Sequence, residues 1–201
     1  MVIGGGLAGL WAALFAKLRG HEVSLYERSS QLGGQWNIAC ALPGKEGYVG
    51  VTDYLKRTLE RLEVSLLLDT EVTRELVATA RPDAVIVATG AEPTGLNLPG
   101  SDRPGVVQAN DIIAGCADAR GRVVVVGGRT LALETTLLLA ERGLEVALVS
   151  HSGLGGRRGA DEQITFRGLV RRVIRARIPL YLNAKILEIT ESAIVIDLGE
   201  G

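Results

Sequence analysis

Three glycines near the start of the chain have the spacing of a phosphate-binding turn. Gly4, Gly6 and Gly9 form the pattern G-x-G-x-x-G between a short apolar stretch and a longer one. In such a turn the first glycine permits the tight bend, the second lets a pyrophosphate approach the backbone, and the third lets a helix lie close to the strand. A helix that begins at Leu7 and Ala8 then presents free N–H groups and partial positive charge. The pattern predicts a dinucleotide site.

A carboxylate follows this turn at the spacing that a nucleotide ribose requires. Glu27 ends the predicted second strand, 23 positions after Gly4, and Arg28 comes next among the candidate cofactor-binding residues. A carboxylate in this place can accept hydrogen bonds from an adenosine ribose. A glycine pattern by itself is weak evidence, and its alternative is a purely structural turn. The surrounding strand, helix, strand and acid favour nucleotide binding.

The first hundred residues alternate between strand and helix patterns. Leu10, Ala13, Leu14 and Leu18 fall on one face of the predicted first helix. The segment AVIVA does not alternate and is rich in β-branched residues, which predicts a strand buried within a parallel sheet. The predicted elements are a helix at 7–19, a strand at 22–27, a loop at 29–48, a helix at 51–62, and strands at 64–68 and 84–88.

The same order of elements recurs in the second half of the chain. Residues 122–150 contain a strand, a glycine turn with Gly127 and Gly128, a helix and another strand. Two copies of one unit predict an α/β protein with two Rossmann-like, doubly wound parallel-sheet lobes, at 1–104 and 105–201. The further elements expected in the second lobe are a basic helix at about 164–176, a strand at 179–182 and a hairpin at 185–198.

Both ends of the chain are expected to be cut from a larger protein. Only two residues separate Met1 from the first glycine, whereas a strand usually has about five. The chain also stops at Gly201, soon after the predicted hairpin.

The second glycine turn departs from the pattern of the first. Arg129 stands where the phosphate-approach glycine is expected, and its side chain could either block a phosphate or bind one. The strand that follows ends in Ser150 instead of an acid, which removes the usual signature for the NAD ribose. Arg157 and Arg158 lie where a 2′-phosphate could be met, with a solvated basic turn as the alternative.

Composition and charge exclude several classes of protein. The 201 residues are 47% hydrophobic and carry a net charge of −1, so neither disorder nor strong attraction to nucleic acid or anionic membrane is expected. No uncharged apolar run is long enough to span a membrane, and no secretion signal is evident. Cys40 and Cys116, far apart in sequence, are expected to be buried free thiols of a cytoplasmic protein.

Four further segments identify a family resemblance. They are ERSSQLGGQWNIACALPGKEGY (27–48), DTEV (69–72), VIVATGAEP (85–93) and RPGVVQANDII (103–113). Together they closely resemble the C-terminal flavin and pyridine-nucleotide module of the 2,4-dienoyl-CoA reductase, trimethylamine dehydrogenase and NADH:flavin oxidoreductase family. The resemblance covers nearly the whole chain, and LGGQWNIA with PGKE is its most specific part.

The resemblance implies roles for further residues. The first glycine turn would hold the pyrophosphate of FAD, Glu27 its ribose, and the second glycine turn would line the flavin nucleotide, with Val72 at the adenine. Simple turn glycines and a core valine are the alternatives. The residues implied beyond the first turn and its acid are Gly33, Gly34, Gln35, Val72, Ala88, Thr89 and Gly90.

The resemblance also implies a function. NADH or NADPH would deliver hydride to FAD, and electrons would pass to a TIM-barrel reductase domain that carries FMN and an iron–sulfur cluster. That cluster would lie outside this segment, because the two separated cysteines here cannot supply its four ligands. No catalytic acid or base is expected in this segment, because the cofactor carries the chemistry. A non-catalytic ADP-binding module with a degenerate second site is the main alternative, and a self-contained NAD-dependent dehydrogenase is a weaker one.

Overall fold

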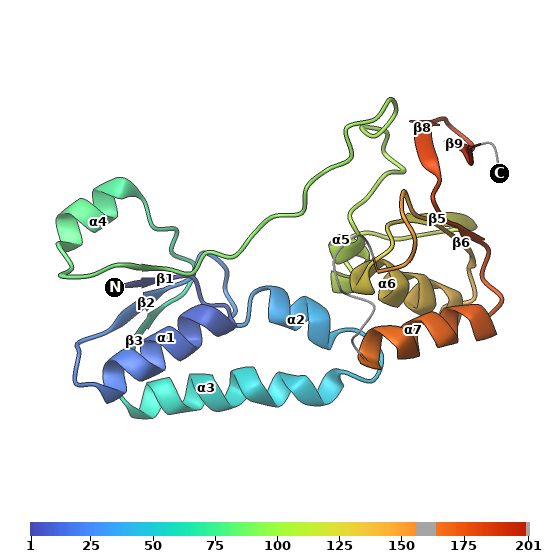
Figure 1. Ribbon diagram of the computed structural model, residues 1–201. Coiled ribbons are helices and arrows are strands. Elements are labelled where there is room, and N and C mark those ends of the chain that lie inside the picture. The colour runs from blue at the N-terminus through green and yellow to red at the C-terminus, as the bar shows by residue number, and fades with distance from the viewer. Residues whose placement is uncertain (156–163, 200–201) are drawn as a thin grey trace. The chain divides into compact units, whose positions relative to one another are not determined.

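The computed structural model describes residues 1–155 and 164–199 of the chain (Figure 1). The chain forms two compact units, Met1–Glu92 and Pro93–Gly201. The division into an FAD-binding lobe at 1–104 and an NAD(P)-binding lobe at 105–201 stays a prediction.

A four-stranded parallel sheet forms the centre of the first unit. Its strand order is β3-β2-β1-β4, so consecutive strands are joined by crossovers that carry helices. The elements of this sheet and its main helices are β1 (Val2–Ile3), α1 (Leu7–Leu18), β2 (Ser24–Tyr26), α3 (Val49–Arg61), β3 (Ser65–Leu67) and β4 (Ile86–Val87). The predicted succession of strands and helices in this unit is confirmed.

Helices α1 and α3 lie side by side and pack against each other (Figure 1). Leu10 of α1 and Leu55 and Leu59 of α3 are fully buried, together with Val2 and Leu25 of the strands. The apolar residues recur at helical spacing in both helices, and burying that stripe is what fixes α1 against the sheet. The start of α1 is thereby held close to the end of β1.

Two predictions for this unit are wrong in detail. The predicted loop at 29–48 contains α2 (Gln35–Cys40) and the short 3-10 helix η1 (Glu46–Tyr48), and α4 (Arg74–Ala80) was also not predicted. These helices are too short to give a clear apolar period. The segment at 84–88 forms β4, but it is not a buried strand, since Val87 is 71% exposed. This strand lies at the edge of the sheet, where β1 is its only strand partner among the described residues.

The second unit contains a three-stranded parallel sheet of order β5-β6-β7 and a separate antiparallel hairpin of β8 and β9. The predicted hairpin and the repeat of strand, turn, helix and strand are confirmed. The elements are α5 (Ala109–Ala114), β5 (Arg122–Val126), α6 (Thr130–Glu141), β6 (Glu145–Val149), α7 (Ile164–Arg175), β7 (Leu180–Tyr181), β8 (Lys185–Ile189) and β9 (Ile194–Asp197).

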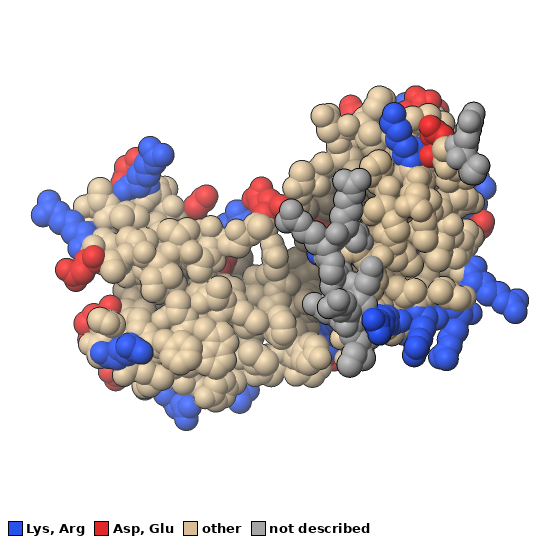
Figure 2. Space-filling view, viewed as in Figure 1, with Lys and Arg blue, Asp and Glu red and all other residues tan. Residues whose placement is uncertain are grey.

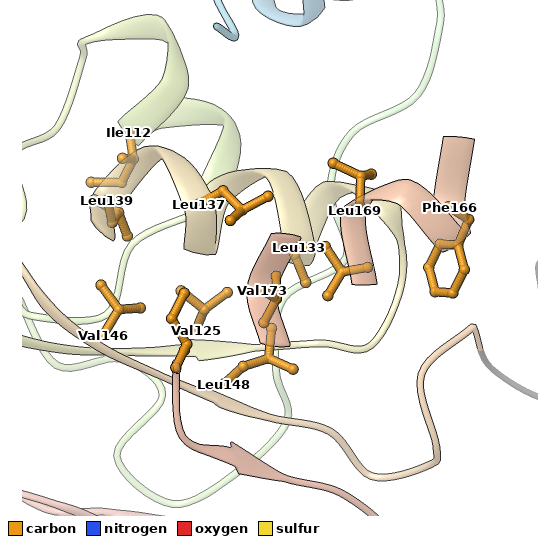
Figure 3. Close-up of a cluster of buried hydrophobic side chains, with 12 residues drawn as sticks. Ile112, Val125, Leu133, Leu137, Leu139, Val146, Leu148, Phe166, Leu169 and Val173 are labelled. Carbon is orange, nitrogen blue, oxygen red and sulfur yellow. The ribbon is translucent and has the colours of Figure 1, made fainter. Parts of the chain in front are cut away.

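The core of the second unit lies between its parallel sheet and the helices α6 and α7 (Figure 3). Leu133 of α6 and Val173 of α7 are fully buried and point toward Val125 and Leu148 of the sheet. Phe166 and Leu169 extend this cluster along α7. The core fixes the start of α6 at the end of β5, as the first core fixes α1 at the end of β1.

The outer face of α7 is basic. Lys and Arg side chains gather over this helix in the space-filling view (Figure 2), and Arg167, Arg171 and Arg175 are exposed, as their spacing predicts. None of the helices in the described part of the chain is long and apolar enough to cross a membrane. Both cysteines are free, but only Cys40 is buried; Cys116 is exposed, because it lies just beyond the end of α5, and its predicted burial is wrong.

Candidate nucleotide-binding site

The first glycine turn joins the end of β1 to the start of α1. Gly4 has a φ of +107°, which favours glycine, and its N–H donates to the Tyr26 carbonyl at 2.8 Å. A Cβ on Gly4 would overlap the Ala88 carbonyl group, and a Cβ on Gly9 would overlap the carbonyl oxygen of Gly4. The turn needs glycine at these two positions because β4 and α1 approach its backbone so closely.

The position of Gly6 is open on the side where a phosphate would lie. Gly6 is the N-cap of α1 in extended backbone conformation, and no side chain among the described residues caps it. A Cβ on Gly6 would find only the Gly33 carbonyl oxygen, at 4.0 Å. The first N–H groups of α1, at Leu7, Ala8 and Gly9, have no carbonyl partner within the helix. The turn therefore offers space and N–H donors to an anion, and a pyrophosphate fits it.

Glu27 lies directly after β2 and is held by three hydrogen bonds. Its Oε2 accepts from the Gly5 N–H at 2.6 Å, and its Oε1 accepts from the Ser29 N–H at 2.9 Å and the Ser29 hydroxyl at 2.8 Å. The residue is only 9% exposed. The contact with Gly5 places the carboxylate against the phosphate-binding turn, where the ribose of a bound nucleotide is expected.

The hydrogen bonds also set the ionisation of Glu27. Burial raises the pKa of this carboxyl, but hydrogen bonds from the backbone of Ser29 and Gly5 and from the Ser29 hydroxyl lower it, as does the positive charge of Arg28. The pKa lies below its ordinary value as a result. Glu27 is therefore ionised at neutral pH and able to accept hydrogen bonds from ribose hydroxyls.

The second glycine turn packs directly on the first. The Gly33 N–H donates to the Gly5 carbonyl at 2.8 Å, and Gly33 forms an isolated parallel bridge with Gly6. Gly34, with a φ of +53°, is the N-cap of α2. The Asn37 amide donates to the Leu32 carbonyl at 2.8 Å and fills the space that a Cβ on Gly33 would need. The structure thus brings the two predicted glycine turns together.

The segment after β4 runs back to these turns. The Ala88 N–H donates to the Ile3 carbonyl at 2.7 Å, which places Ala88, Thr89 and Gly90 beside the first turn. The Gln35 side-chain amide donates to the Ala91 carbonyl. Arg28 forms an exposed ion pair with Glu92 at 3.9 Å, a separation at which an exposed pair contributes little.

Val72 lies on a third segment that reaches Glu27. The Thr70 N–H donates to the Glu27 carbonyl at 2.9 Å, and the Asp69 N–H donates to the Ser29 carbonyl at 3.1 Å. Val72 follows this contact and is half-buried. Its proximity to an adenine ring stays a prediction.

Three functional positions in this site were missed in the sequence. Gly5 supplies the N–H that binds Glu27, Ser29 supplies two more donors, and Asn37 braces the second turn. The signal for Ser29 was its place two residues after the acid, from which a serine can donate a hydrogen bond to the carboxylate. Gly5 and Asn37 gave no such signal, because their roles depend on contacts between separate segments.

The glycine turn of the second unit repeats the backbone of the first. The Gly127 N–H donates to the Val149 carbonyl at 2.8 Å, and the Gly155 N–H donates to the Gly128 carbonyl at 2.7 Å. Arg129 is the N-cap of α6, with a φ of −110° and extended backbone, and its side chain is exposed. The backbone at this position does not require glycine, so arginine is accommodated without strain.

Ser150 takes the place that Glu27 has in the first unit. It follows β6, is 2% exposed, and accepts a long hydrogen bond from the Ser152 N–H at 3.4 Å. The Ser150 hydroxyl fills the space beside Gly128 that a Cβ there would need. The second turn thus has a small neutral group where the first has a carboxylate. Arg157 and Arg158 lie outside the described residues.

Comparison with known proteins places this geometry in a family. The sequence profile described as pyridine nucleotide-disulphide oxidoreductase matches residues 1–200. The chain belongs to this family. Domains of the family bind FAD and NAD(P)H, so the class of this chain is a flavin- and NAD(P)-linked oxidoreductase module. The predicted fold class and the predicted cofactors are confirmed at this level.

Individual relatives support the resemblance seen in the sequence. The chain is 41% identical over 153 residues to an NADH oxidase of Thermoanaerobacter brockii, a match that covers 74% of this chain and 24% of that protein. It is 35% identical over 202 residues to a bilirubin reductase of Mediterraneibacter gnavus, covering 100% of this chain and 31% of that protein. The chain therefore spans about a third or less of these relatives.

Solved structures give the same result. A 2-naphthoyl-CoA reductase matches 97% of this chain and 30% of its own, with a TM-score of 0.86 and 27% identity. A 6-hydroxypseudooxynicotine amine oxidase of Pseudomonas geniculata N1 matches 97% and 31%, with a TM-score of 0.82 and 31% identity. Both similarities extend over nearly the whole of this chain and confirm the resemblance to multidomain flavoenzymes.

Proposed function

We propose that this chain is the electron-input module of a larger flavin-dependent oxidoreductase. In this proposal the lobe at 1–104 binds FAD and the lobe at 105–201 binds NADH or NADPH. Electrons that enter from the nicotinamide coenzyme pass to a separate reductase domain, for which a TIM barrel with FMN and an iron–sulfur cluster is the expected type. The NADH oxidase and bilirubin reductase relatives, each several times longer than their match to this chain, support that assignment.

The observation that carries the proposal is the arrangement around the first glycine turn. An open helix N-terminus for a pyrophosphate and an ionised carboxylate for a ribose lie on either side of Gly5, whose N–H binds that carboxylate at 2.6 Å. This combination recognises the two polar parts of an adenine dinucleotide at once. A structural turn would need neither the open space at Gly6 nor the buried acid.

The residues of this chain would bind and orient the cofactor. FAD, when bound, supplies the capacity to accept hydride and to pass electrons on singly or in pairs. Gly6 and the first N–H groups of α1 would hold the pyrophosphate, and Glu27 would hold the ribose. Gly33, Gly34 and Gln35 of the second turn and the segment 88–91 would contribute further contacts to the cofactor.

The second unit supports a coenzyme site through its repeated backbone. Gly127, Gly128 and the N-terminus of α6 reproduce the turn of the first unit, and α6 has free N–H groups in its first turn. Arg129 is exposed at that N-terminus, where its guanidinium is available to a phosphate. In this proposal Arg129 is a phosphate ligand of the second site.

The proposal is tested by identifying what the purified protein releases on heating. We expect flavin absorbance at about 450 nm in the supernatant, near one equivalent per chain. Anaerobic addition of NADH or NADPH to the flavin-loaded protein should then bleach that absorbance. Adenine absorbance without flavin, or a flavin that neither coenzyme reduces, would contradict the electron-input role.

A non-catalytic adenine-nucleotide module is the second candidate function. The observation that favours it is the divergence of the second turn, where Arg129 and Ser150 replace the expected glycine and acid. In that case the first unit would hold ADP and the second would bind no coenzyme. The same heat-release measurement separates the two functions, because only the first predicts flavin.

A further inference from the structure

Ser29 has a hydroxyl group with two acceptors at the same distance. Its oxygen lies 2.8 Å from Glu27 Oε1 and 2.8 Å from the carbonyl oxygen of Gln31. A serine hydroxyl has one proton, so it can donate fully to only one of these acceptors at a time. Either bond leaves the proton satisfied, and rotation about the C–O bond exchanges them.

The acceptor to which the Ser29 hydroxyl donates determines how many sites on Glu27 remain for a ligand. An ionised carboxylate has about four lone-pair sites. Three are used by the Gly5 N–H, the Ser29 N–H and the Ser29 hydroxyl. A ribose diol brings two hydroxyl donors, so the carboxylate is one site short as long as Ser29 donates to it.

We propose that Ser29 is a ribose-recognition residue that changes its hydrogen-bond partner when a nucleotide binds. Its hydroxyl holds the Glu27 carboxylate in the free protein and turns to the Gln31 carbonyl when the diol arrives. Turning frees a site on Oε1 and keeps the Ser29 proton bonded. It also leaves the Ser29 oxygen and Oε1 2.8 Å apart with no proton between them, a repulsion that a diol hydroxyl donating toward both oxygens would relieve. Ser29 thereby adds one acceptor of its own to those of Glu27.

The backbone around Ser29 allows this side chain to act alone. The Ser29 N–H stays bonded to Glu27 Oε1, and the Ser29 carbonyl accepts from the Asp69 N–H at 3.1 Å. Removing the hydroxyl therefore leaves the loop and two of the three bonds to Glu27 in place. This inference rests on the proposed function, because it takes Glu27 as the ribose ligand of the first site.

The test compares ADP with 2′,3′-dideoxy-ADP, which lacks both ribose hydroxyls. Each nucleotide is titrated calorimetrically against the wild-type chain, Ser29→Ala, Ser29→Thr and Ser30→Ala. We expect Ser29→Ala to bind ADP about 3- to 10-fold more weakly and to bind the dideoxy nucleotide as the wild type does. Ser29→Thr keeps a hydroxyl and should retain the preference for ADP. Ser30 is an exposed neighbouring serine, and its variant should bind both nucleotides normally.

Two results would overturn the role of Ser29. One is an unchanged preference for ADP in Ser29→Ala, and the other is an equal loss of both nucleotides, which would show a structural role only. A Glu27→Gln variant separates these results from failure of the site assignment. If the wild type prefers ADP and Glu27→Gln loses that preference while Ser29→Ala keeps it, only the role of Ser29 is wrong. If the wild type has no preference for ADP, Glu27 is not the ribose ligand, and the assignment of the first site fails together with the role of Ser29; release of flavin on heating still decides the electron-input role separately.

Discussion

The two glycine turns of this chain share a backbone and differ in their chemistry. In the first, Gly4 donates to Tyr26 at 2.8 Å, and in the second, Gly127 donates to Val149 at the same distance. The bracing bond from the later glycine is also repeated, at 2.8 Å from Gly33 and 2.7 Å from Gly155. The two units thus share the backbone hydrogen bonds of the turn, whereas the side chains beside the turn differ.

The difference lies in the group that follows the second strand of each unit. Glu27 is a buried carboxylate fixed by three hydrogen bonds, whereas Ser150 is a buried hydroxyl with one long bond from Ser152. A carboxylate can bind both hydroxyls of a ribose, and a serine cannot replace both acceptors. An acceptor for both ribose hydroxyls is therefore expected in the first unit and not at Ser150 in the second.

The largest expected effect is on the backbone that the two turns share. Gly4→Ala would place a Cβ against the Ala88 carbonyl at a φ of +107°, so we expect a loss of about 3 kcal/mol in the free energy of unfolding and no nucleotide binding. Urea unfolding and ADP titration measure both. Gly47→Ala is the control, since nothing lies within 4 Å of its Cβ and its φ is not positive. Normal stability of Gly4→Ala would contradict the close approach of β4.

A smaller effect is expected at the acid that distinguishes the first turn. Glu27→Ala should weaken ADP or FAD binding by about 1.5–3 kcal/mol, because it removes a charge-assisted contact to the ribose. The first unit should remain folded, as far-ultraviolet circular dichroism can show. The matched change in the second turn, Ser150→Ala, should leave ADP binding to the first site unchanged. Unchanged affinity in Glu27→Ala would contradict the assignment of the first site.

The Arg129 side chain tests whether the second turn still binds a phosphate. Arg129→Gly should weaken binding of NADH and NADPH by roughly 1.5–3 kcal/mol if the guanidinium contacts a phosphate. The measurement is a titration of both coenzymes against both forms. Tighter binding by the variant would mean that the side chain blocks the site, and it would favour the non-catalytic function. An unchanged affinity would place Arg129 outside the phosphate path.

The ionisation of Glu27 gives a prediction for pH. Because the pKa of Glu27 is lowered in the folded chain, its contribution to stability is complete above the ordinary pKa of a glutamate. That contribution is lost as the pH falls through the lowered pKa. The free energy of unfolding of the wild type should therefore fall more steeply on acidification than that of Glu27→Gln. Parallel urea titrations at several acid pH values would show equal slopes if the carboxylate were not held.

The smallest expected effect concerns the segment after β4. Gln35→Ala removes the bond to the Ala91 carbonyl and should increase the rate of FAD dissociation, at a cost of about 1 kcal/mol in affinity. Stopped-flow displacement of the flavin measures this rate. Gln31→Ala changes an exposed side chain shortly before α2 and should leave the rate unchanged. A rate equal to the wild type in Gln35→Ala would mean that Gln35 does not fasten this segment.

The amino-acid sequence by itself determined the class of fold and predicted where the first site lies. Gly4, Gly6, Gly9 and Glu27 are informative because a tight turn and a ribose acceptor depend on local spacing along one strand, turn, helix and strand. The repeat in residues 122–150 was equally readable, since a strand, a glycine turn, an apolar helix and a second strand follow one another in the same order. The departures at Arg129 and Ser150 were also visible in the sequence. Their effect on coenzyme binding could not be predicted from it.

Only the tertiary structure decided which groups meet. The bond from Gly5 to Glu27, the bridge between Gly6 and Gly33, and the exposure of Val87 join or expose residues from different segments. An apolar run such as AVIVA has the same local pattern at the centre of a sheet as at its edge, so its burial depends on neighbours that local sequence does not name. The short helix α2 also depends on contacts between segments, since its first residue, Gln35, donates to the Ala91 carbonyl and its six residues give no clear apolar period.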